Sequence, residues 1–140
     1  MSMMPAPDDL SFRDRFEAGL VPPADFNHRA HLLLAYVYLC EGPVEHAMPR
    51  MRAAIQGFLN RNGVPDGKYH ETLTRSWLMA VAYFMDKAHP ATSFDRFLRQ
   101  DARLLDTQIM LTHYRKDTLF SDAARAAFVA PDLHAIPAGA

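Results

Sequence analysis

The stretch Asp25-Phe-Asn-His28-Arg-Ala-His31-Leu-Leu-Leu-Ala-Tyr-Val-Tyr-Leu-Cys40 decides the fold. From residue 30 to residue 40, His31 is the only strongly polar side chain, so nearly every face of the helix that this stretch predicts needs cover from other elements. Asp25 or Asn27 can cap the helix, and the prolines at 22 and 23 keep the incoming chain extended. The stretch therefore predicts a buried central helix at about 27–40 that opens with two histidines.

The composition indicates an ordinary globular domain without a charged partner. The chain has 140 residues, 49% of them hydrophobic, and its 15 basic and 16 acidic side chains leave a net charge of -1. This balance favours neither nucleic acid nor an anionic membrane as a partner. The start of the chain lacks the basic and apolar regions of a signal peptide, and a lone Cys40 cannot form an internal disulfide. We therefore expect a cytoplasmic protein with a buried thiol.

The remaining chain predicts helices and little else. A second very apolar helix is expected at about 68–88, with polar groups in its first turn, and amphipathic helices at about 10–20, 44–60, 93–105 and 121–129. Residues 107–115 fit either a helix or an irregular turn, and Pro49 either kinks its helix or marks its first turn. We predict an all-α, single-domain bundle of about five to six helices at 10–132, with two very apolar central helices, a flexible tail at 1–9 and a C-terminal tail at 133–140.

Four polar side chains predict a metal site at one end of the two apolar helices. His28 and His31 are three residues apart, on one side of a first turn, and His70 and Glu71 open the other helix. If these first turns meet, the four side chains form a plausible ligand set for a divalent transition metal, namely zinc, iron or nickel. Because His70 and Glu71 are about 100° apart around a helix, Glu71 can instead orient a ligand or act as a general base.

The sequence also limits this metal hypothesis. The segment that starts at His70-Glu71 carries Thr74 where the zincin motif needs its second histidine, so a protease of that type is not predicted. A purely structural role for the histidines is an equal alternative: they can cap helices, bond to backbone groups and pair with Glu71. Arg29 is a competing partner for the same carboxylate.

A second group of residues suggests binding of an anion or a small molecule. His113, Tyr114 and Arg115 lie just before a predicted helix start, and Tyr69 precedes His70. In one hypothesis, a metal-dependent enzyme acts on a small molecule and Glu71 or His113 moves protons. In another, a metal-free module holds a small apolar and acidic ligand with the histidines, Tyr69 or Tyr114, and Arg115. In a third, the domain only forms an interface, for example in a homodimer.

Three motifs resemble an uncharacterised family of small bacterial all-helical proteins. They are Phe26-Asn-His28-Arg-Ala-His31-Leu32, Lys68-Tyr69-His70-Glu71-Thr72, and Thr118-Leu119-Phe-Ser121-Asp-Ala-Ala124-Arg125 followed by Phe128-Val-Ala-Pro131-Asp132. The first two correspond to the patterns FxHxxHL and KYHET, and the likeness spans about residues 12–132. The resemblance implies one compact helical domain and points to the same histidines, but it implies no reaction.

Overall fold

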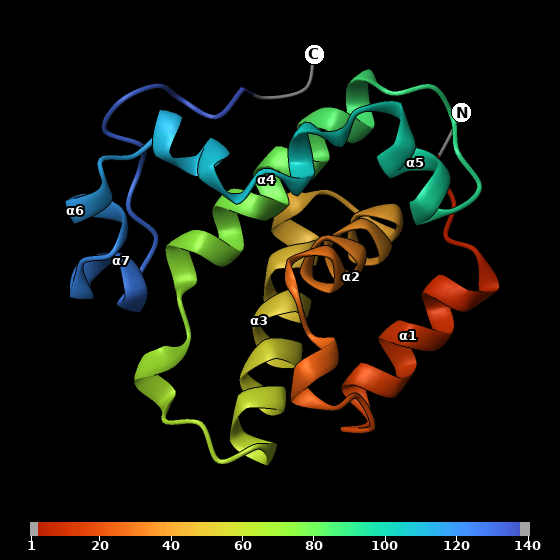
Figure 1. The fold of residues 1–140 in the computed structure, drawn as a ribbon, viewed down its shortest axis with the longest axis horizontal. Coiled ribbons are helices and arrows are strands. Elements are labelled where there is room, and N and C mark those ends of the chain that lie inside the picture. The colour runs from red at the N-terminus through yellow and green to blue at the C-terminus, as the bar shows by residue number, and fades with distance from the viewer. Residues whose placement is uncertain (1–2, 138–140) are drawn as a thin grey trace.

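Helix α2 (His28–Glu41) runs through the middle of the molecule, and α3 (Val44–Arg61) and α4 (Glu71–Lys87) pack against it (Figure 1). The computed structural model describes residues 3–137, and over that range it contains helices and no strand. The all-α prediction is confirmed. The other elements are α1 (Pro7–Glu17), η1 (Pro23–Asp25), η2 (Asp66–Lys68), α5 (Phe94–Gln100), η3 (Ala102–Leu105), η4 (Thr107–Thr112), α6 (Lys116–Leu119) and α7 (Asp122–Ala126), where η denotes a 3-10 helix.

The burial of α2 follows its sequence closely. Every residue from Leu32 to Tyr38 is buried, which confirms that this helix is the central one. Of the two candidate caps, Asn27 is the one used, because its side-chain oxygen accepts a hydrogen bond from the Ala30 N–H at 2.9 Å. The cap places His28 in the first turn.

Both predicted tails contain structured residues within the described range. Helix α1 begins at Pro7, inside the expected tail, and Asp9 holds its start by accepting hydrogen bonds from the backbone of Ala6 and Phe94 at 2.8 and 2.9 Å. At the other end, Ile136 is buried in the core. Some residues of both predicted tails therefore contribute to the folded structure. The parts of these predictions at residues 1–2 and 138–140 lie outside the described range.

Several helix boundaries differ from the prediction because side chains cap the backbone. Helix α4 begins at Glu71 since His70 is its cap, and α5 ends at Gln100 since Asp101 caps the following η3. Pro49 lies inside α3 rather than in its first turn. No helix within residues 3–137 is long and apolar enough to cross a membrane.

Helix α4 is central but less apolar on its buried face than predicted, because Thr72, Thr74 and Ser76 are buried there. The Thr72 hydroxyl donates to the carbonyl of Ala127 and accepts from the N–H of Val129, both at 3.0 Å. Ser76 lies 3.1 Å from the hydroxyl of Tyr114. These hydroxyls attach the C-terminal segment and α7 to α4, at the left side of Figure 1.

Candidate functional site

His28 lies between α4 and η3. Its Nε2 is 2.8 Å from the carbonyl oxygen of Leu104, and since a carbonyl can only accept, Nε2 carries the proton. The ring meets Trp77 edge-on, with centroids 4.5 Å apart. The other ring nitrogen, Nδ1, has no hydrogen-bond partner among the described residues, so the neutral imidazole can still accept one there.

His31 faces a different neighbour. Its ring lies 6.1 Å from that of Phe26, and its Nδ1 is buried without a hydrogen-bond partner. Burial, reinforced by repulsion from His28, lowers the pKa of His31 to about 4. This imidazole is therefore neutral at pH 7.

His70 is committed to the backbone on both sides. Its Nδ1 accepts from the Leu73 N–H at 3.1 Å and so caps α4, and its Nε2–H donates to the Leu119 carbonyl at 2.7 Å. Burial lowers the pKa of His70, and the nearby positive charge of Arg125 acts in the same direction. Both ring nitrogens are therefore occupied in the neutral form.

The predicted metal ligands have separate partners in the structure. The start of α2 contacts α4 at Trp77, seven residues after His70, which corresponds to about 10 Å along a helix. Across residues 3–137 no group of three or more histidine, cysteine or acidic side chains is arranged to hold a metal ion. The structure thus brings His28 and His31 near each other, with His70 and Glu71 elsewhere.

Glu71 forms an ion pair with Arg52 of α3. Arg52 donates Nε–H and Nη2–H to the two carboxylate oxygens at 3.0 and 2.5 Å, and the hydroxyl of Tyr69 donates to Glu71 at 2.8 Å. These hydrogen bonds, first of all those from Arg52, hold the pKa of Glu71 below its usual value, which weakens it as a general base. Arg29, the partner considered from the sequence, instead pairs with Asp95 at 3.4 Å.

The next three predicted residues, His113, Tyr114 and Arg115, form hydrogen bonds with the C-terminal segment. The Nδ1–H of His113 donates to the His134 carbonyl at 2.7 Å. Tyr114 is fully buried, with its hydroxyl donating to the Val129 carbonyl at 2.6 Å, so its predicted role in ligand binding is not supported. Arg115 is exposed, and its backbone N–H donates to Asp132 at 2.9 Å.

One of the predicted residues, His28, lines a pocket of about 420 Å³ between α4, η4 and α6. We call it the His28 pocket. Its walls are mainly apolar, with polar groups at a few points, and its lining residues are His28, Leu73, Trp77, Thr107, Gln108, Met110, Leu111, Lys116, Leu119 and Phe120. Tyr69 and Glu71 line a different cleft, together with Arg52 and Arg125.

Lys116 and Phe120 line the His28 pocket and were not among the predicted site residues. Lys116 is exposed and has no ion-pair partner within residues 3–137, and Phe120 is 47% exposed although it is a large apolar side chain. The segment from His113 to Arg115 was predicted to bind an anion, and Lys116 follows it directly in the sequence. Nothing local identifies Lys116 as the one beside a pocket.

No family model, curated protein or solved structure matches the chain. The resemblance to a family of small helical proteins therefore stays a prediction, and the function is argued from the residues of this chain.

Proposed function

We propose that this protein binds a small organic acid with an apolar body in the His28 pocket, without a metal ion. The observation that carries the proposal is the composition of the pocket: an apolar wall with an imidazole and an ammonium group at separate points. Small-molecule sites typically measure about 300–1,000 Å³ and combine such walls with a few polar groups that orient the ligand. The His28 pocket falls within this range at about 420 Å³.

Each polar group has a distinct role in the proposed complex. The ammonium of Lys116 pairs with the carboxylate of the ligand, because no acidic side chain of the described residues competes for it within ion-pair distance. The Leu104 carbonyl fixes His28 with its proton on Nε2, so Nδ1 is available as an acceptor for a ligand hydroxyl. The apolar body of the ligand packs against Trp77 and Phe120.

Trp77 makes the proposal directly measurable, because it is the only tryptophan in the chain and lies in the pocket wall. The probes are octanoate and 1-octanol, which share an apolar chain and differ in charge. We expect octanoate to change the Trp77 emission saturably and to bind more tightly than 1-octanol. In the Lys116→Met variant the octanoate affinity should fall about ten-fold, the loss of one charge-assisted hydrogen bond.

Lys68→Met is the matched control, since Lys68 is exposed and does not line the His28 pocket. It should bind octanoate as the parent protein does. Equal affinities for octanoate and 1-octanol, or an unchanged Trp77 emission with both, would contradict the proposal.

Elemental analysis of protein purified without a histidine tag tests the metal hypothesis separately. Near-stoichiometric metal in the parent protein that is lost in His28→Ala and His70→Ala would favour a metal site.

A further inference from the structure

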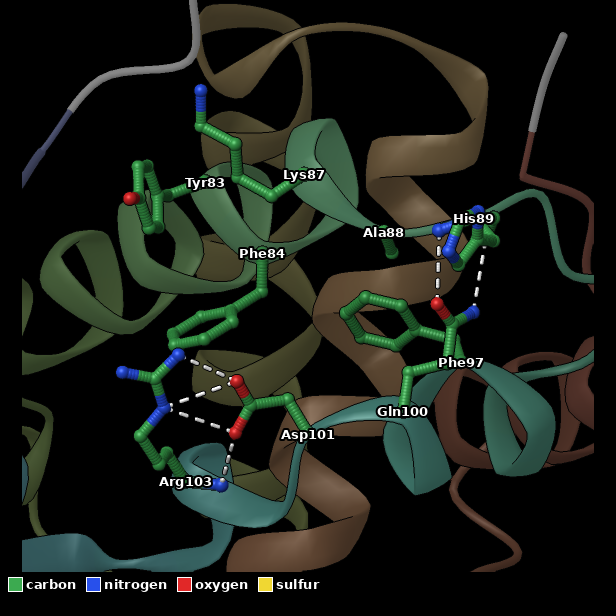
Figure 2. Close-up of a pocket in the computed structure, with 9 residues that line it drawn as sticks. All are labelled: Tyr83, Phe84, Lys87, Ala88, His89, Phe97, Gln100, Asp101 and Arg103. Carbon is green, nitrogen blue, oxygen red and sulfur yellow. Dashed lines mark hydrogen bonds and ion pairs between the residues drawn. The ribbon is translucent and has the colours of Figure 1, made fainter.

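A second hollow lies at the other end of α4, where α5 turns into η3. Figure 2 shows the rings of Phe84 and Phe97 beside this hollow, with Asp101 and Arg103 at one end and His89 at the other. Its volume is about 270 Å³. It shares no lining residue with the His28 pocket, so it is a separate place for a ligand.

Hydrogen bonds between the lining residues hold the walls of this hollow in place. The amide of Gln100 accepts from the N–H of His89 at 2.8 Å and donates to its carbonyl at 2.9 Å, which ties α5 to the end of α4. Asp101 accepts from the backbone N–H of Arg103 at 3.0 Å and from its guanidinium at 2.6 to 3.0 Å. A ligand therefore meets a site that is organised before it binds.

The charge at the rim is positive. The guanidinium of Arg103 lies over the ring of Phe84, 5.1 Å from its centroid, and the ammonium of Lys87 lies over Tyr83 at 5.7 Å. The carboxylate of Asp101 neutralises one of these two cations, so one positive charge is left over. Arg103 retains Nη1, which has no hydrogen-bond partner among the described residues.

We propose that the hollow between α4 and α5 is a second ligand site, for a small aromatic carboxylate. The aromatic ring of the ligand packs against Phe84 and Phe97, which line the hollow as apolar walls. The carboxylate of the ligand lies at the rim, where Arg103 and Lys87 outnumber Asp101. This site is independent of the proposed function of the His28 pocket.

The test uses three probes of similar shape: phenylacetate, the neutral phenylacetamide and the cationic phenethylamine. Binding is followed by two-dimensional NMR of the full chain, through the backbone amides of residues 88–89 and 100–103. The indole N–H of Trp77 serves as the marker of the His28 pocket. We expect phenylacetate to shift the amides around Gln100 and to bind about three- to five-fold more tightly than phenylacetamide, as a partly exposed charge pair allows.

Two variants give opposite expected changes. Arg103→Met should reduce phenylacetate affinity about three- to five-fold, whereas Asp101→Asn should increase it, because the competing carboxylate is removed. Arg99→Met is the matched control: Arg99 is 79% exposed on α5 and outside the hollow, and its loss should leave binding unchanged.

The titrations of the unmodified protein with the three probes are sufficient to contradict the proposed carboxylate site. Tighter binding of phenethylamine would assign recognition to Asp101 and reject the carboxylate class. No shift with any of the three probes would reject the site. A shift of the Trp77 indole alone would place the ligand in the His28 pocket, so failure here and failure of the proposed function give different spectra.

Discussion

The Nε2–H of His70 donates a hydrogen bond to the carbonyl oxygen of Leu119 at 2.7 Å, and this contact joins the start of α4 to the end of α6. The same imidazole caps α4 through Nδ1. Because α6 supplies one wall of the His28 pocket, His70 supports that pocket without lining it. His70 therefore affects the His28 pocket indirectly, by holding the backbone of Leu119 in place.

This arrangement predicts graded losses on substitution of His70. His70→Ala removes the cap and the bond to Leu119, and each is worth about 1 kcal/mol, so the free energy of unfolding should fall by about 2 kcal/mol. His70→Asn keeps a capping side chain and should lose only about 1 kcal/mol. Urea unfolding followed by circular dichroism measures both values.

His46→Ala is the control for these two variants. His46 is exposed, and its loss should change stability by less than about 0.5 kcal/mol. Equal effects of alanine and asparagine at position 70 would contradict the assignment of His70 as a cap.

Thr72 offers a test of how α7 is attached. Thr72→Val keeps the shape of the side chain but removes the bonds to Ala127 and Val129, so stability should fall by about 2 kcal/mol. Thr74→Val is the matched control, since the Thr74 hydroxyl donates to the His70 carbonyl one turn earlier. Hydrogen exchange at the Val129 amide should accelerate in the first variant alone, and equal exchange in both would argue against this attachment.

Local pattern was sufficient to predict the central helix and to narrow its cap to Asp25 or Asn27. The unbroken apolar run after His31 requires burial on all sides, and Asn27 and Ser121 are capping residues whose roles depend on neighbours three residues away. The backbone hydrogen bonds that the structural alternative for the histidines predicts are present at His28 and His70.

The predicted convergence of the histidines depended on a quantity that local sequence does not contain. How α4 packs along α2 is determined by side-chain packing, here in part by Trp77 against His28. The pairing of Glu71 with Arg52 crosses a loop and likewise has no signal in spacing. The His28 pocket needs Lys116 and Phe120 from a distant segment, which only the fold brings together.

The ion pair between Arg52 and Glu71 should contribute measurably because it is bidentate and partly buried, with the Glu71 side chain 15% exposed. In a double-mutant cycle with Arg52→Met and Glu71→Gln, we expect a coupling free energy of about 1 kcal/mol. The pair of Arg29 and Asp95 is about half exposed on both sides and is the control, with coupling near zero.

The same pair has a defined pH dependence. Since Arg52 lowers the folded-state pKa of Glu71, the stabilisation is complete above the unfolded-state value near 4.5 and is lost as the pH falls below it. The coupling measured at pH 7 should therefore shrink at pH 3. A coupling that is equal at both pH values would show that the carboxylate charge is not its source.

His31 should make the protein less stable in mild acid. Its folded-state pKa of about 4 lies below the ordinary histidine value of 6.5, so the unfolded chain binds the proton first, and stability is full above about pH 6.5 and falls towards pH 4. Single-site linkage gives a loss of about 2 kcal/mol of unfolding free energy between pH 7.5 and pH 5.

The His31→Leu variant removes both the titrating imidazole and its unpartnered buried Nδ1. It should therefore be at least as stable as the parent protein at pH 7.5, and more stable by about 2 kcal/mol at pH 5. Urea unfolding at the two pH values measures the difference. Because all other titrating groups, including His70, are common to both proteins, a difference that stays constant with pH would mean that His31 is not the acid-sensitive group.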